Sequence, residues 1–170
     1  MMTLEKVQFQ LEIPLNSSKG VLFNCISTPS GLAEWFCDDV NIKKDVHIFF
    51  WDGSEESARM VSKKKDEFVK FRWLEAEEEG EDTYFEFRIR MDDLTGENSL
   101  VITDFADDDE VEDAKDLWRA QVNRLRQVLG CGPQGSRKPD KRLLSQGAQV
   151  WWPLSSMFLI SVLDATVAPF

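Results

Sequence analysis

The chain of 170 residues has one histidine, His47, and only three cysteines, Cys25, Cys37 and Cys131. No two cysteines form a CxxC pair, and their number is odd. A zinc site built from this set would need carboxylates from distant parts of the chain, so the sequence predicts neither a metal site nor a cofactor. We expect the cysteines to be small buried side chains in a reducing compartment, which indicates a cytoplasmic protein.

Basic residues are also scarce. There are 20 lysines and arginines against 31 aspartates and glutamates, which gives a net charge of -11. The basic run SKKKD at 62–66 is short and ends in an acid. A chain this acidic repels nucleic acid and anionic lipid surfaces, so we expect no nucleic-acid partner.

Long apolar runs are missing as well. No stretch reaches the ~18 apolar residues of a membrane span, and the N-terminal MMTLEKVQFQ lacks the apolar segment of a signal peptide. We therefore expect no stable insertion into a membrane. Aromatic bulk, in contrast, is abundant: the six tryptophans and twelve phenylalanines must be buried or must line a pocket.

Hydrophobic periodicity predicts one α+β domain over residues 1–130. Residues 6–13 alternate as a half-buried strand, and two short helices follow it, at about 16–28 and 31–36. Short polar links between the later strands indicate antiparallel neighbours. These five further strands are expected at 46–51, 56–62, 68–74, 83–91 and 98–105.

A long amphipathic helix is predicted at about 109–129. Acids crowd its start and arginines its end, as the helix dipole favours, and Gly130 is a suitable stop. Because no other long amphipathic element is left, this helix must lie across one face of the six-stranded sheet. Sheets twist and curl, so the space between the sheet and the helix can stay open.

Several segments, in their order along the chain, resemble the START-like (SRPBCC) superfamily. They are TPSGLAEWFCDD, FFWDGSEESA, FVKFRW, YFEFRI and ITDFADDDEVEDAKDLWRAQVNRLRQVLG. Within that superfamily they resemble the branch with the C-terminal domain of the activator of heat-shock-protein-90 ATPase, and especially small START-like proteins of Bacteroidetes-type bacteria. The resemblance covers about residues 4–130.

The resemblance implies a helix-grip fold, in which a curved antiparallel sheet of about six strands wraps around a long C-terminal α-helix. An apolar cavity between sheet and helix is part of that expectation. Members of the superfamily bind lipids, sterols, polyketides or hormones, and some are cyclases, dehydratases or co-chaperones. The fold does not choose among these functions.

The candidate ligand-binding residues are all aromatic. The resemblance implies that the end of the second short helix lies at one mouth of the cavity, where Trp35 and Phe36 could gate access. The interpretation that we favour is that these two rings simply pack the helix against the sheet. The set as a whole fits either a solid core or a pocket lining, and the sequence does not decide between them. The candidates are Trp35, Phe36, Trp51, Phe71, Trp73, Phe85, Phe87 and Trp118.

Polar candidates are few, and we name no catalytic residue. Asp38 and Asp39 are adjacent, would point to opposite faces of an extended segment, and are expected as solvated turn residues. His47 has no partner at a Ser-His-Asp or Cys-His spacing, so we expect a structural role for it. The acidic run at 75–82 is expected as a solvated hairpin tip; the alternative is a patch for a partner or a divalent cation, although it lacks a calcium-loop spacing.

The hypothesis that we favour is a small START-like binding protein that holds an apolar ligand, such as a lipid, between the sheet and the C-terminal helix. The alternative is a co-chaperone-like interaction domain that regulates a chaperone ATPase. An enzyme of the cyclase or dehydratase kind would need inward polar groups, and the strands offer almost none beyond Thr83 and the further candidates Arg59 or Arg72.

Residues 131–170 differ from the rest in composition. The first 130 residues carry 16 basic and 29 acidic residues, and the last 40 carry 4 and 2. We therefore expect a boundary at Gly130, followed by a tail of uncertain order. That tail could be an added strand pair, a docking segment, a peripheral membrane contact, or sequence not selected for folding, such as read-through past a natural stop.

Overall fold

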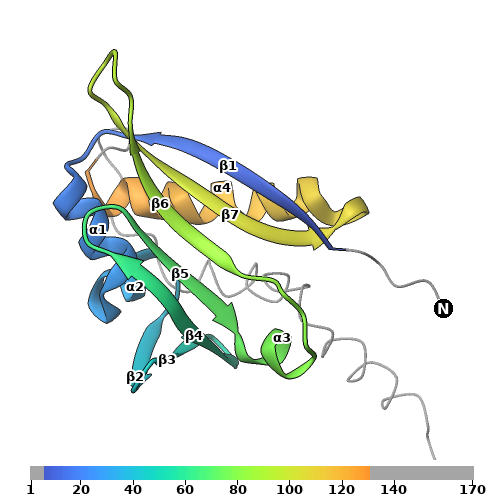
Figure 1. Ribbon diagram of the computed structural model, residues 1–170. Coiled ribbons are helices and arrows are strands. Elements are labelled where there is room, and N and C mark those ends of the chain that lie inside the picture. The colour runs from blue at the N-terminus through green and yellow to red at the C-terminus, as the bar shows by residue number, and fades with distance from the viewer. Residues whose placement is uncertain (1–5, 131–170) are drawn as a thin grey trace, which may run out of the picture. The chain divides into compact units, whose positions relative to one another are not determined.

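The structure is a computed structural model that describes residues 6–130 (Figure 1). Residues 131–170, with the alternatives predicted for them, lie outside the described residues. The elements follow the predicted order of a strand, two short helices, a run of strands and a long helix. In chain order they are β1 (Lys6–Leu15), α1 (Lys19–Ser27), α2 (Pro29–Trp35), β2 (Asp39–Lys43), β3 (Val46–Trp51), β4 (Ser54–Lys64), β5 (Phe68–Trp73), α3 (Leu74–Glu78), β6 (Phe85–Met91), β7 (Asn98–Asp107), the 3-10 turn η1 (Asp108–Glu110) and α4 (Val111–Val128).

The strands form one antiparallel sheet in the order β1-β7-β6-β5-β4-β3-β2. From β2 to β7 each strand pairs with its neighbour along the chain, as the short links predicted. The first strand pairs with the last one, from Lys6 opposite Asp107 to Leu15 opposite Asn98. The meander is confirmed, and β1 is added beside its final strand.

The sheet has seven strands rather than the six expected, because β2 was missed. Asp39, expected in a turn, begins this strand and lies opposite Phe50 of β3. Both Asp38 and Asp39 are exposed, as predicted. Val40 is the one buried residue of β2, so its pattern carries little of the alternation that marks a strand.

The acidic run at 75–82 is only in part the loop that the sequence predicted. Its first residues form α3, and the strand expected at 83–91 begins at Phe85. Ala76 is the buried residue of this short helix, while the glutamates around it point outward. Because a single small side chain anchors α3, the sequence gives almost no helical periodicity for it.

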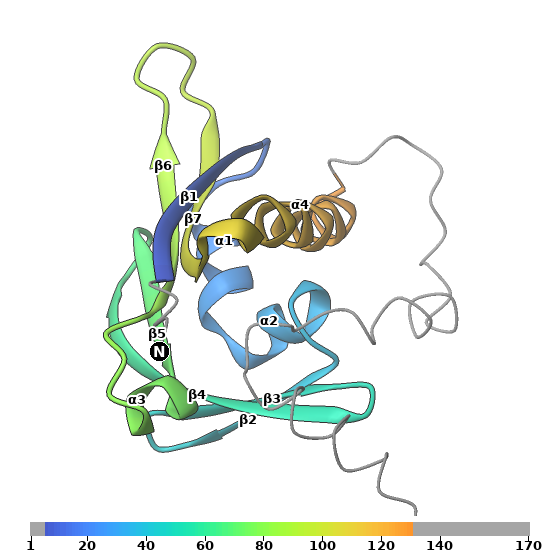
Figure 2. The same cartoon turned by 90° about the vertical axis from the view of Figure 1, so that its right-hand side faces the viewer.

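The long helix α4 lies on the concave side of the sheet, with α1 and α2 beside it (Figure 2). The sheet curls around these helices, so that β2, β3 and β4 lie across the end of the upright strands β5, β6 and β7. The buried residues of α4 fall on one face. This is the predicted helix-grip arrangement. Among the described residues, none of the helices is long and apolar enough to cross a membrane.

Candidate functional site

An aromatic cluster lies between the sheet and α4. Phe36, at the end of α2, is its centre: six rings from α2, β3, β6 and α4 have centroids 5.1–6.0 Å from its own ring. These rings belong to Trp35, Phe49, Trp51, Phe85, Phe87 and Trp118. Phe71 and Trp73 of β5 join the cluster through Phe85, at 5.1 and 4.7 Å.

The structure therefore brings all eight candidate residues together. The prediction omitted one member, Phe49, because strand 46–51 is apolar on both faces and its inward side could not be assigned. The pairing of β3 with β2 and β4 turns His47 and Phe49 inward, and both are buried. That register is a non-local property, so the strand's own sequence does not reveal it.

Exposure divides the cluster into an interior and an edge. The rings of Trp35, Phe36, Phe49, Phe71, Phe85 and Phe87 are fully buried, and Trp118 is 4% exposed. Trp51 and Trp73 are half-buried. The cluster thus runs without interruption from a fully buried interior to two half-buried indoles at its edge.

Trp35 and Phe36 pack inside the cluster, which agrees with the interpretation favoured from the sequence. The Trp35 indole N–H donates to the Cys25 carbonyl at 2.9 Å and so ties α2 to α1. The Trp51 indole N–H donates to the Phe36 carbonyl at 2.9 Å and ties the end of β3 to the end of α2. The two indole N–H groups therefore fix α2 in place, while the apolar parts of their rings fill the core.

A buried carboxyl, Asp104 on β7, was missed in the sequence. Its Oδ2 accepts a hydrogen bond from the Trp118 indole at 2.9 Å, and its Oδ1 accepts one from the Phe105 backbone N–H at 2.8 Å. Burial raises the pKa of Asp104 to about 7, against the lowering effect of these two hydrogen bonds. Alternation along the strand could have revealed it, because Asp104 lies two and four residues after Ile102 and Leu100 and so shares their inward face.

The raised pKa of Asp104 predicts a pH dependence of stability. The unfolded chain releases this proton near the ordinary value of 3.8 and the folded chain near 7, so the contribution of Asp104 to the free energy of unfolding is complete below about pH 4 and is lost as the pH rises to about 7. Urea titrations from pH 4 to 8 on wild type and Asp104→Asn measure this as the difference between the two proteins. A difference that stays level over that range would contradict it.

His47 lies inside the sheet at 2% exposure. Its ring packs edge-to-face on Phe71, at a centroid distance of 5.1 Å. Neither ring nitrogen makes a hydrogen bond of good geometry with a described residue, although the backbone of Asp45 lies close enough to raise the pKa of the imidazole. Burial lowers the pKa of the imidazole, so it is neutral at physiological pH.

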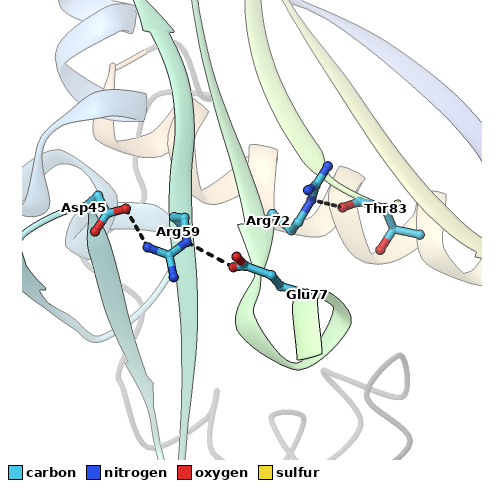
Figure 3. A network of polar contacts seen from close by, with 5 residues as sticks. All are labelled: Asp45, Arg59, Arg72, Glu77 and Thr83. Carbon is cyan, nitrogen blue, oxygen red and sulfur yellow. Dashed lines mark hydrogen bonds and ion pairs between the residues drawn. The ribbon is translucent and has the colours of Figure 1, made fainter. Parts of the chain in front are cut away.

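Arg59 and Arg72, considered as inward polar groups, face away from the cluster. They lie opposite each other on β4 and β5, in alternation with the inward Ala58 and Trp73. Arg59 bridges Asp45 and Glu77, as Figure 3 shows, at 2.6 and 3.0 Å.

The other arginine of Figure 3, Arg72, donates to the Thr83 carbonyl at 3.2 Å and to the Asp82 carboxylate at 2.8 Å. Its guanidinium is thus engaged on the outer side of the sheet, and the two arginines considered for an enzyme do not converge on the aromatic cluster. Within residues 6–130, no group of three His, Cys, Asp or Glu side chains is arranged to hold a metal ion.

Comparison with known proteins identifies a matching family and several solved structures with a similar fold. A family model described as the START-like superfamily domain matches residues 2–131. BfR322 from Bacteroides fragilis, solved in solution, is 36% identical, with 79% of this chain and 98% of that one covered and a TM-score of 0.54. No curated protein gives a significant match.

Two more distant structures share the fold alone. Aha1 from Colwellia psychrerythraea, solved as a dimer, is 14% identical over 76% of this chain and 99% of that one, with a TM-score of 0.60. ChR145 from Cytophaga hutchinsonii is 12% identical over 76% and 97% of the two chains, with a TM-score of 0.57. Sequence identities this low carry no information about shared ligands or partners.

Proposed function

The chain belongs to the START-like superfamily, and on that premise we propose that it holds an apolar small molecule, such as a lipid, between the sheet and α4. The observation that supports this most is the continuous aromatic cluster, which runs from the buried Phe36 to the half-buried Trp51 and Trp73. Sites for apolar ligands are lined mainly by such side chains, with a few polar groups that fix orientation.

The two half-buried indoles are the place where a ligand first meets the cluster. Trp73 stacks on Phe85 at 4.7 Å, and Trp51 packs edge-to-face on Phe36 at 5.5 Å. A ligand that inserts between such rings replaces ring–ring contacts with ring–ligand contacts of the same apolar kind. The surface that it removes from water, its own and that of the indoles, then drives binding.

Trp73→Ala is expected to weaken the binding of an uncharged fluorescent lipid probe about tenfold or more, because the ligand loses the burial of one indole face. The dissociation constant from a fluorescence titration measures the effect, and native mass spectrometry of the purified protein shows whether a ligand is already bound. Leu94→Ala is the matched control, since Leu94 is 96% exposed on the β6–β7 turn. Absence of probe binding, or equal losses in the two variants, would contradict the proposal.

A second candidate is a co-chaperone-like domain that binds a chaperone and changes its ATPase rate. Two observations favour it: the likeness of the fold to Aha1 from Colwellia psychrerythraea, and a net charge of -11, which suits a basic partner surface. An ATPase assay with a bacterial chaperone of the heat-shock-protein-90 class separates the candidates, and an unchanged rate would remove this one.

We also propose a cytoplasmic location and a domain boundary near Gly130. Cys25 and Cys37 are both free and buried, as suits a reducing compartment. The matched family region ends at residue 131, which supports treating residues 1–130 as the START-like domain and the remainder as a tail.

A further inference from the structure

His47 occupies the inward face of the sheet beside the half-buried edge of the aromatic cluster. In the strand register it lies between Ile42 of β2 and Ala58 of β4, and Ala58 lies opposite Trp73 of β5. One row of side chains therefore crosses the concave face from Ile42 to Trp73, with the imidazole in the middle and a small alanine beside it.

The surroundings of the imidazole are apolar. Phe71 packs against it edge-to-face at 5.1 Å, and Phe49 lies along its ring at 6.1 Å; both are fully buried. Neither nitrogen of His47 makes a hydrogen bond of good geometry with a described residue, although the backbone of Asp45 lies close enough to raise the pKa of the imidazole. Buried polar groups are nearly always paired, and an unpaired one costs free energy, so an imidazole without a well-formed hydrogen bond calls for an explanation.

We propose that His47 is the polar anchor of the ligand site, where its imidazole hydrogen-bonds the hydroxyl group of an otherwise apolar ligand. This inference rests on the proposed function and deepens it by naming the ligand class. A neutral imidazole has one donor nitrogen and one acceptor nitrogen, and a hydroxyl group can accept from the first or donate to the second.

A carboxylate fits this position less well than a hydroxyl. The apolar rings of Phe49 and Phe71 pack against the imidazole, and burying a carboxylate in such surroundings is far costlier than burying a hydroxyl. The ligand class is therefore an uncharged alcohol with a hydrocarbon body that contacts Phe49, Phe71 and the indole of Trp73.

Three probes of equal chain length test the inference: octanol, chlorooctane and octanoate. Wild type should bind octanol roughly five- to tenfold more tightly than chlorooctane, the effect of about one net hydrogen bond, and octanoate most weakly. In His47→Phe, which keeps an aromatic ring without nitrogens, octanol should lose that advantage while chlorooctane binds as before. Trp73→Ala is the matched comparison, because it should weaken octanol and chlorooctane alike.

Because His47 is the sole histidine of the chain, its ring nitrogen signals can be assigned directly in the NMR spectrum of labelled wild-type protein. Octanol should shift them and chlorooctane should leave them nearly unchanged, a readout that does not depend on how well the variant folds. If none of the probes binds, the proposed function falls and the inference falls with it. If the probes bind with equal affinity and the nitrogen signals do not move, or if octanoate binds most tightly, the inference alone is overturned.

Discussion

Replacing Phe36 with alanine is expected to lower the free energy of unfolding by about 3–5 kcal/mol. The ring is fully buried, and six other rings lie within 6.0 Å of it, centroid to centroid. These rings are carried by α2, β3, β6 and α4, so no single element can move to fill the space that the missing ring leaves. The cost therefore includes both the lost burial and an unfilled cavity.

Urea unfolding followed by far-ultraviolet circular dichroism measures the effect of Phe36→Ala. The control is again Leu94→Ala, an exposed apolar side chain, for which a change within about 0.5 kcal/mol is expected. A loss below about 1 kcal/mol for Phe36→Ala would mean that the neighbouring rings close the gap. The cluster would then be a loosely packed core, and the role given to Phe36 as its centre would be wrong.

The second large effect is expected at Gly31, where α1 meets α2. A Cβ atom at this position would lie 2.1 Å from the Asn24 carbonyl oxygen and 2.7 Å from the Cys25 Cα. Both are backbone atoms of α1, so a side chain can enter only if the two helices separate. We expect Gly31→Ala to destabilise the protein by more than about 4 kcal/mol, in the range that marks a specific steric conflict.

Gly20 is the matched control for Gly31, because it lies in α1 and a Cβ atom added there would have no other atom within 4 Å. Gly20→Ala should stabilise the protein by about 0.5–1 kcal/mol, since alanine favours the helix and restricts the unfolded chain. The two identical substitutions should therefore shift the urea midpoint in opposite directions. Equal shifts would show that α1 and α2 are not in close backbone contact.

The sequence was informative wherever one strand or helix carries its own pattern. Alternation identified the inward faces of β5 and β6, and with them Phe71, Phe85 and Phe87. The three- and four-residue spacing of apolar side chains in α4 placed Trp118 on its buried face. These local patterns were enough to predict a long helix across one face of the sheet and most of the aromatic cluster, while the helix-grip fold was implied by the resemblance to the START-like superfamily.

What the sequence could not supply depends on neighbours far away along the chain. Phe49 faces inward because of the register of β3 with β2 and β4, and nothing within β3 selects that face. The pKa of Asp104 is raised because its side chain is buried once α4 covers that face of β7, where Trp118 is hydrogen-bonded to it. Likewise, the lack of a well-formed hydrogen bond at His47 becomes visible only when every neighbouring side chain is in place.

The pairing of β1 with β7 has a consequence for synthesis on the ribosome. Lys6 finds its partner Asp107 about a hundred residues later, and at roughly 5–20 residues per second that interval is about 5–20 seconds. Throughout it, the nascent chain carries an N-terminal strand with nothing to pair with, and hydrophobic rings that α4 has yet to cover. Both features make the nascent chain prone to aggregation until α4 has left the exit tunnel.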